Sequence, residues 1–189
     1  ATPESAKELL IAAVACDDPV IYLESRWLYK INGSGGCDNP DPSVLSKAKV
    51  LREGNDITLV AVADMVVEAL RASVMLQTLG ISAEVIDAVS VYPLDIYTIH
   101  RSADKTGLVM AIDAANPQYS VASEIAATID AFTLTCPDTP CPTAPTLTSR
   151  YYPTDADIVN EVLTVLGDNR RIRVEKSFSQ LHLPPTDDI

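Results

Sequence analysis

Residues 57–95 read ITLVAVADMVVEALRASVMLQTLGISAEVIDAVSVYPLD, and this stretch decides the fold. The run ITLVAVA over 57–63 is continuously apolar, as is typical of a strand that is buried on both faces. A second apolar run, rich in β-branched residues, follows over 81–89. The helix-forming segment MVVEALRASVMLQTL separates the two runs. A strand, a helix and a strand of these lengths predict a right-handed βαβ unit with parallel strands.

The helix between the two strands carries its own boundary signals. Asp64 stands where a side chain caps a helix N-terminus, and Gly80 stands where a helix ends. The apolar residues of this segment indicate one buried face, which we expect to contain Val67, Leu70 and Val74.

The quoted stretch ends at YPLD. Pro93 has no backbone N–H to donate, so it cannot continue a central strand. Asp95 stands at the position where the next helix begins. We therefore interpret YPLD as a corner at which a strand leaves its sheet and a helix starts.

The remaining elements extend this pattern in both directions. Upstream, SKAKVLREG over 46–54 alternates like an edge strand. Downstream, we predict a buried strand (TGLVMAID), a helix (SVASEIAATI), a short strand (FTLTC) and a last helix. A Thr154–Asp157 capping box opens the last helix, which contains Ile158, Val162 and Leu166 and ends at Gly167. The expected fold class is α/β, with a three-layer, mostly parallel sheet and helices on both of its faces.

The chain changes character toward its two ends. Thr2 and Pro3 predict the start of a helix, and PVIYLE after that helix predicts a short strand. The run INGSGGCDNPDPS is rich in Gly, Asn, Asp and Pro, which is typical of a linker. We expect a helix and a strand over 1–30, a linker over 31–46, the α/β domain over 47–167 and an extended tail over 168–189.

Composition excludes several classes of function. The formal net charge of −12 lacks the basic footprint that phosphate binding needs, so we expect no nucleic-acid partner. No apolar run reaches the length that spans a bilayer, so we expect no membrane partner, and the first residues, ATPESAKELL, do not resemble an export signal. The acids favour a solvated surface, with the docking of a basic protein segment as the alternative.

The cysteines favour a reducing compartment. They are too few and too scattered for a disulfide scaffold, at Cys16, Cys37, Cys136 and Cys141. The CPDTPC pair has no further Cys or His cluster beside it, so zinc is disfavoured. A disulfide between Cys136 and Cys141 is the alternative that the spacing leaves open.

No catalytic or cofactor-binding residue stands out in the chain. Asp64, Asp87 and Asp113 follow predicted strands, where α/β sheets bind ligands, but helix capping and turn hydrogen bonds explain them more simply. The only glycine-rich run is followed by prolines instead of a helix, so it does not match a dinucleotide or phosphate loop. Neither His100 nor His182 has a nucleophile or acid of the right type near it in the sequence.

Several blocks nevertheless resemble one family in their order. VIDAVSVYPLD resembles V-I-D-L-R-T-x-x-P-L-D of the transketolase C-terminal domain, in the β subunit of the first component of 2-oxo acid dehydrogenase complexes. DDPVIYLESRWLY resembles D-N-P-V-x-x-L-E-x-x-x-L-Y, and KAKVLREGNDITLV resembles G-K-A-x-V-x-R-E-G-x-D-V-T-I-V. Further blocks follow in the family's order up to about Leu166: KTGLVMAID, ASEIAATI, CPDTPCPTAP and SRYYPTDADIVNEV.

The resemblance implies a fold and a role. Residues 1–30 would be the last helix and strand of a pyrimidine-binding domain, and 47–167 the domain that completes the subunit and packs on its partners. Thiamine diphosphate and magnesium would belong to the complete assembly, and we expect this chain alone to bind neither and to be inactive. The implied partners are an α subunit, a second β subunit and a basic segment of the acyltransferase component. The implied location is the cytoplasm or the mitochondrial matrix.

The resemblance also implies one metal site. In some members, the turn between the first helix and strand supplies backbone carbonyls to a structural potassium ion, which would correspond here to Ala13, Cys16 and Asp18. Carbonyl oxygens suit a hard cation whatever the side chain. The remaining ligand would come from sequence outside this chain, so we expect this turn to bind no ion by itself.

The chain departs from the family pattern at a few strand ends. Val89 stands in place of an arginine, Ser120 and Val121 replace glycines, and Ile112-Asp113-Ala114-Ala115-Asn116 replaces V-x-E-G-x. These positions bear on the substrate and on activity but not on the fold.

Two other classes of function are consistent with parts of the sequence. A protein-interaction module without catalysis would use the acidic surface for binding and would be sensitive to salt. An independent nucleotide-binding α/β domain is disfavoured by the missing glycine fingerprint.

Overall fold

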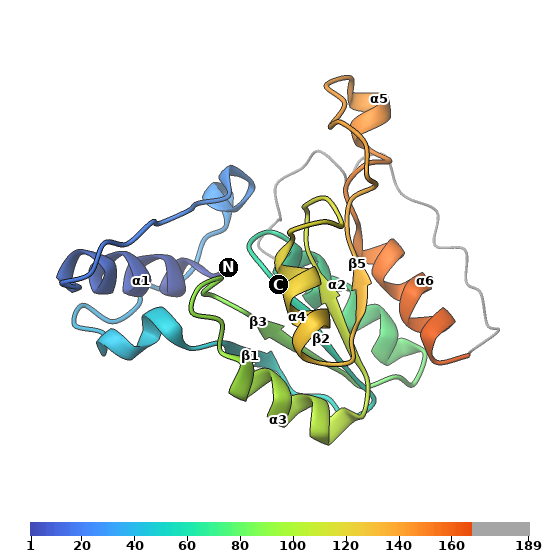
Figure 1. Cartoon of the computed structure of the whole chain (residues 1–189), viewed down its shortest axis with the longest axis horizontal. Coiled ribbons are helices and arrows are strands. Elements are labelled where there is room, and N and C mark those ends of the chain that lie inside the picture. Colours follow the sequence, from blue (N-terminus) through green and yellow to red (C-terminus); the bar gives the residue numbers. More distant parts are fainter. Residues whose placement is uncertain (168–189) are drawn as a thin grey trace.

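A five-stranded sheet, with strand order β1-β3-β2-β4-β5, forms the centre of the computed structural model (Figure 1). The structure describes residues 1–167, and the predicted tail over 168–189 lies outside the described residues. β1 is antiparallel to β3, and the other neighbouring pairs are parallel. The mostly parallel sheet is therefore confirmed. Its strands are β1 (Lys49–Arg52), β2 (Ile57–Ala61), β3 (Ala83–Asp87), β4 (Val109–Ile112) and β5 (Phe132–Leu134).

The predicted βαβ unit forms the middle of the sheet. β2 and β3 pair in parallel from Ile57 opposite Ala83 to Ala61 opposite Asp87, and helix α2 (Met65–Thr78) connects them. Every residue of both strands is buried. The continuous apolar run of β2 thus reflects burial on both faces, as the sequence indicates.

Helices cover both faces of the sheet and make three layers. One core places Leu59 and Val85 of the sheet against α2 and α6 (Asp155–Val165). The other core places Val60 and Ile86 against α3 (Ile96–Thr106) and α4 (Val121–Thr128). Alternate residues of the same strands thus face opposite cores, which confirms the predicted architecture.

Most helix boundaries agree with the sequence. The Thr2 side chain caps α1 (Pro3–Ala15), and Thr154 and Asp157 form the predicted capping box at α6. Asp95 caps α3 after the YPLD corner. In the described part of the chain, no helix is both long and apolar enough to cross a membrane.

Two predictions about α2 are wrong. Asp64 makes no side-chain capping hydrogen bond, because it already has the right-handed helical conformation, with φ −65° and ψ −24°. Val74 is 55% exposed, whereas Val66, Ala69 and Leu76 are completely buried. Of the other two residues of the predicted face, Val67 is buried and Leu70 packs partly buried against the core, so only the placement of Val74 is wrong.

The strand predicted over 19–24 is also wrong. These residues form no strand, and they pair with no strand among residues 1–167. Ile21 and Leu23 are 88% and 80% exposed. The sequence has the alternation of a strand, but a strand needs a neighbour to pair its backbone groups, and the sheet of the described chain does not reach this segment.

The predicted linker packs along α1, which lies to one side of the sheet in Figure 1. Ser34 Oγ donates to Glu4 Oε1 at 2.8 Å, and Lys7 Nζ donates to the Gly36 carbonyl at 3.0 Å. Lys49 of β1 pairs with Glu8 of α1 at 3.0 Å. A short 3-10 helix, η1 (Arg26–Lys30), precedes this run, and a second one, η2 (Pro42–Ser46), forms its last residues.

Candidate functional site

The carboxyl edge of the parallel strands is the place where a doubly wound sheet binds ligands. The structure places Asp64, Asp87 and Asp113 at this edge, after β2, at the end of β3 and after β4. Burial raises the pKa of Asp113, and the nearby charge of Asp64 adds to this rise. The sequence-predicted acids therefore share one edge.

Two of these acids accept hydrogen bonds from backbone N–H groups. Asp87 Oδ1 accepts from the Val89 N–H at 2.9 Å, and its Oδ2 lies 2.5 Å from the amino group of Ala1. Asp113 Oδ2 accepts from the Val121 N–H at 2.9 Å, at the start of α4. These bonds confirm that turn and helix-end hydrogen bonds account for Asp87 and Asp113.

Asp95 stabilises the YPLD corner through hydrogen bonds. Its carboxylate accepts from the Thr98 hydroxyl at 2.7 Å and N–H at 3.2 Å, and from the Ala48 N–H at 3.2 Å, just before β1. Burial acts to raise the pKa of Asp95, but these hydrogen bonds outweigh it and hold the pKa below its usual value. One side chain thus joins the corner, α3 and the edge strand.

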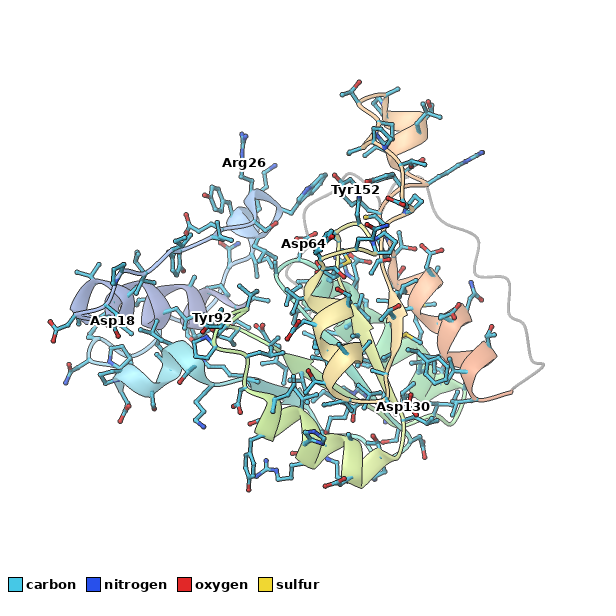
Figure 2. The ribbon with its side chains drawn as sticks, in the orientation of Figure 1. Asp18, Arg26, Asp64, Tyr92, Asp130 and Tyr152 are labelled. Atoms are coloured by element: carbon cyan, nitrogen blue, oxygen red, sulfur yellow. The ribbon has the colours of Figure 1, made fainter. Side chains whose placement is uncertain are left out.

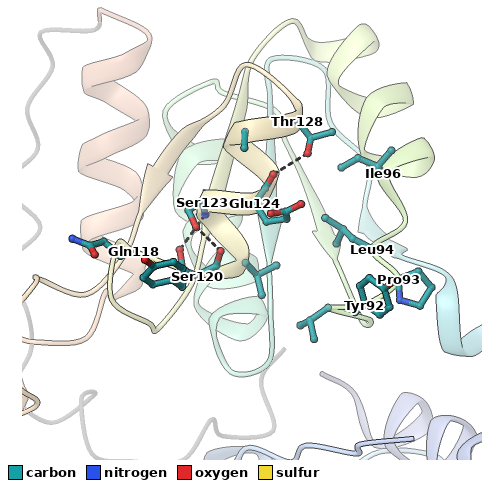
Figure 3. A pocket seen from close by; sticks show the side chains of 13 residues that line it. Tyr92, Pro93, Leu94, Ile96, Gln118, Ser120, Ser123, Glu124 and Thr128 are labelled. Carbon is teal, nitrogen blue, oxygen red and sulfur yellow. Dashed lines mark hydrogen bonds between the residues drawn. The ribbon is translucent and has the colours of Figure 1, made fainter. Parts of the chain in front are cut away.

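A groove lies beside this corner, between residues 91–96 and α4 (Figure 3). Its volume is about 1030 Å³ and its lining is mainly apolar. Tyr92 and Tyr119 are 92% and 99% exposed at its walls, and Glu124 projects from α4. An exposed apolar surface that is rimmed by polar groups is typical of a binding surface.

Three of the residues that depart from the family pattern, Val89, Ser120 and Val121, lie in or next to this groove. Val89, in the corner, has a φ of 59°, which a β-branched residue rarely adopts. Ser120 lines the groove and caps α4, since its Oγ accepts from the Ser123 N–H at 3.0 Å. The substitutions therefore alter a loop and a helix start, and the strands between them are intact.

The three residues predicted to bind potassium lie together at the end of α1. Ala13 is in the last turn of the helix, Cys16 is the residue that ends it, and Asp18 lies in the bend that follows. Figure 2 shows Asp18 at the far end of α1 from the sheet. A helix C-terminus carries a partial negative charge, which suits a cation.

All four cysteines are free thiols in the structure. Cys136 is buried, and burial raises its pKa to about 11. Cys141 is exposed, and its Sγ lies 3.2 Å from the Tyr152 hydroxyl. That contact, together with burial, raises the pKa of Tyr152 to about 12. The free thiols include Cys136 and Cys141, the pair whose spacing leaves a disulfide open.

Two sequence features that bear on metal binding and acid–base chemistry are the acidic and cysteine side chains and the two histidines. Within residues 1–167, no three His, Cys, Asp or Glu side chains are arranged to hold a metal ion. His100 is exposed on α3, and His182 lies outside the described residues.

Sequence reasoning missed one buried charge. Glu84 of β3 is completely buried, and Lys105 of α3 donates to its Oε2 and to Glu53. The Gly54 N–H also donates to this carboxylate at 3.4 Å, and Glu84 Oε1 has no hydrogen-bond partner among residues 1–167. A glutamate inside the apolar run AEVID was the available signal, because a buried acid requires a cation.

Comparisons with known proteins identify the family of this chain. A family model described as transketolase, C-terminal domain, matches residues 46–158. The β subunit of acetoin:2,6-dichlorophenolindophenol oxidoreductase from Bacillus subtilis (strain 168) is 41% identical over 176 residues, which cover 88% of this chain and 51% of that protein. The β subunit of the pyruvate dehydrogenase E1 component from the same strain is 40% identical over 129 residues, which cover 68% of this chain and 40% of that protein.

A solved structure described as a split gene transketolase, inactive beta4 tetramer, also matches. Its TM-score is 0.60 and its identity 28%, over 72% of this chain and 48% of that one. The chain spans about half the length of the curated relative that it matches over 176 residues.

Proposed function

Because the chain belongs to the transketolase C-terminal domain family, we propose that it is the C-terminal portion of a thiamine diphosphate-dependent β subunit or of a transketolase-like protein. Its role in the complete assembly is to join subunits and to dock partners. The similar proteins are named as β subunits of a pyruvate dehydrogenase component and of an acetoin oxidoreductase, so the substrate class is a 2-oxo acid or acetoin.

This proposal rests on the hydrogen bonds that the carboxylates accept at the carboxyl edge of the sheet. Asp87, Asp95 and Asp113 all accept hydrogen bonds from backbone N–H groups, so they hold corners and helix starts in place. Exposed tyrosines and apolar residues beside them are better suited to contact another protein than to move a proton.

The described residues do not fit the thiamine diphosphate and magnesium of such an assembly. A magnesium–diphosphate group needs oxygen ligands and a cradle of backbone N–H groups, and the chain's glycine-rich run is packed on α1 instead. The cofactor therefore belongs to other parts of the assembly, in an upstream domain and an α subunit. Residues 1–30 complete the upstream domain, and 31–46 connect it to the α/β domain over 47–167.

The remaining partners and the location follow from the same assignment. A second β subunit and a basic segment of an acyltransferase component are the other partners, with the net charge of −12 supporting the latter. A cytoplasmic or matrix location fits the bacterial and mitochondrial relatives and the free thiols. Ala13, Cys16 and Asp18 contribute carbonyls to a potassium site once a further segment supplies the missing ligand.

The test is reconstitution. The chain is mixed with an α subunit, with and without an upstream β-subunit half, and native mass and 2-oxo acid decarboxylation are measured with thiamine diphosphate and magnesium. We expect turnover only with all three parts. Turnover by the isolated 189 residues, or failure of any mixture to assemble, would contradict the proposal.

A further inference from the structure

The run CPDTPC over 136–141 places two thiols on one bend of the chain, just after β5. The chain bends at Asp138 and Thr139, and the Thr139 N–H donates to the Pro137 carbonyl at 2.7 Å. This bend lies midway between Cys136 and Cys141. The two thiols are therefore carried on the two arms of a single turn.

Two tyrosines hold this turn from one side. The Tyr151 hydroxyl donates to the Thr139 carbonyl, at the bend, at 3.0 Å. The Tyr152 hydroxyl lies 3.2 Å from Cys141 Sγ, and the rings of Tyr151 and Tyr152 pack edge to face with centroids 5.1 Å apart. The tyrosine pair thus fixes both the bend and the second thiol.

Electrostatic effects indicate that the two sulfurs are neighbours. Burial chiefly raises the pKa of Cys136, and the charges of Asp113 and Cys141 add to the rise. Contact with Cys141 and burial raise the pKa of Tyr152, and the charge of Cys136 adds to that rise. Such interactions between charges weaken with distance, so the thiols lie close to each other and to one tyrosine. A neutral disulfide removes the repulsion between two thiolates.

The two thiols differ in access to solvent. Cys141 is exposed, whereas Cys136 is 1% exposed. A dissolved oxidant therefore reaches Cys141 first, and Cys136 is open mainly to a reaction partner within the chain. An exposed thiol beside a second, resolving thiol is the arrangement of a redox-sensing pair.

We propose that Cys141 and Cys136 form a reversible disulfide, in which Cys141 reacts with a peroxide and Cys136 resolves the product. The Cys141 thiolate attacks one peroxide oxygen, the O–O bond breaks, and the departing hydroxide takes a proton and leaves as water. The sulfur of Cys136 then attacks the resulting sulfenic acid, the S–O bond breaks, and the hydroxide leaves with the thiol proton as a second water. Two thiols and one peroxide thus give one disulfide and two waters. A dithiol reductant reverses the reaction by exchange.

The disulfide changes the surface of the molecule after β5. It closes residues 136–141 into a ring and removes the thiol that contacts the Tyr152 hydroxyl. This ring lies before the segment that carries α5 (Pro145–Thr148), which projects away from the sheet in Figure 1. The inference goes beyond the proposed function, because it requires neither a cofactor nor a partner subunit.

The test is peptide mapping of the full chain after treatment with hydrogen peroxide. The remaining thiols are blocked with N-ethylmaleimide, and the chain is cut with a protease that cleaves before aspartate. Cleavage before Asp138 leaves the two cysteines on separate peptides, 130–137 and 138–154, which stay joined only if a disulfide connects them. We expect the joined pair after peroxide, and its separation after a dithiol reductant is added.

Variants assign the roles of the two thiols. Cys136→Ala removes the resolving thiol, so labelling of the Cys141 sulfenic acid by dimedone is expected to rise about tenfold over the parent chain. Cys141→Ser changes an exposed side chain and is expected to keep the thermal midpoint while Cys136 stays reduced under the same treatment. Cys37→Ser removes another exposed thiol and is the matched control, with the joined peptides expected to form as in the parent.

Three results would overturn the inference. The first is a parent chain in which Cys141 is oxidised to a sulfinic or sulfonic acid while Cys136 remains a free thiol. The second is a disulfide that joins Cys141 to Cys16 or Cys37 instead. The third is oxidation of Cys136 in the Cys141→Ser variant as fast as in the parent, which would remove the role of Cys141 even if Cys136→Ala fails to fold.

Discussion

Glu68 of α2 accepts a hydrogen bond from the backbone N–H of Asp155, the first residue of α6, at 2.9 Å and across 87 residues of sequence. Arg71 holds the other oxygen of the same carboxylate at 2.8 Å. This bond joins the two helices that cover one face of the sheet, and it satisfies a backbone donor that has no partner within α6.

The protonation of Glu68 makes stability depend on pH. Burial raises the pKa of Glu68 above 4.5, against the opposing effects of Asp155 N–H and Arg71. The folded chain therefore holds this proton more tightly, so the contribution of Glu68 to stability falls as pH rises from about 4.5 through the raised pKa. Glu68→Gln keeps an acceptor and should remove that fall in urea titrations at a series of pH values. Identical pH profiles for both proteins would contradict this.

Truncation of the same side chain tests the hydrogen bond. Glu68→Ala leaves the Asp155 N–H without its acceptor and is expected to lower the free energy of unfolding by about 1–2 kcal/mol at pH 7. The matched control is Glu161→Ala, another acid on α6, which should change stability by less than about 0.5 kcal/mol. Equal effects of the two substitutions would sink the assignment.

Lys105 neutralises the buried Glu84. Lys105→Met leaves that carboxylate inside the protein without its cation, and we expect the free energy of unfolding to fall by about 2 kcal/mol. This loss is smaller than for a fully buried pair, because Lys105 is partly exposed. Adding Glu84→Gln should recover most of the loss, because the uncompensated charge is then gone. Hydrogen bonds to Glu53 and Glu84 raise the pKa of Lys105, so its contribution persists at neutral pH and is lost only as pH rises through that pKa.

Gly54 and Gly80 should respond differently to alanine. A Cβ on Gly54 would lie 2.2 Å from the backbone of Ala83 and Glu84, so β1 would have to move away from β3. Gly54→Ala is expected to cost more than about 3 kcal/mol. A Cβ on Gly80 meets nothing, and only its φ of +80° is unfavourable, so the expected cost is about 1 kcal/mol. Thermal unfolding of both variants measures these two costs. A larger loss of stability for Gly80→Ala than for Gly54→Ala would contradict the prediction.

Thiol labelling should separate Cys136 from Cys141. The pKa of about 11 and the burial of Cys136 leave almost no accessible thiolate at pH 8, whereas Cys141 is exposed. Iodoacetamide followed by peptide mass spectrometry is expected to label Cys141 in the folded chain and Cys136 only after unfolding. Equal labelling of both in the folded chain would show that the segment opens readily.

The fold could be predicted where local signals and burial coincide. The two apolar runs, Asp95 after Pro93 and the Thr154–Asp157 pair each identify one element, because strand burial, proline chemistry and helix capping act over a few residues. Val74 was misplaced because the helix is apolar beyond its buried face, and periodicity alone does not say where that face ends.

The candidate site was less accessible to sequence reasoning. The acids Asp87 and Asp113 were found, but the groove depends on how the corner and α4 meet in the folded chain. Lys105 and Glu84 lie 21 residues apart and meet only because α3 packs against the sheet. The glutamate inside the apolar run signals a buried acid, but the identity of the cation that reaches it depends on the tertiary structure.

The βαβ unit of β2, α2 and β3 also bears on the order in which the strands join the sheet during folding. Its two central strands come from one local segment, residues 57–87, so they close a short loop before either edge strand has to find its place. β5 must wait for β4, and β1 can add only to a β3 that is already in position. Pulse-labelling hydrogen exchange should therefore find the amides of β2 and β3 protected ahead of those of β1 and β5, with the sheet growing outward from its middle.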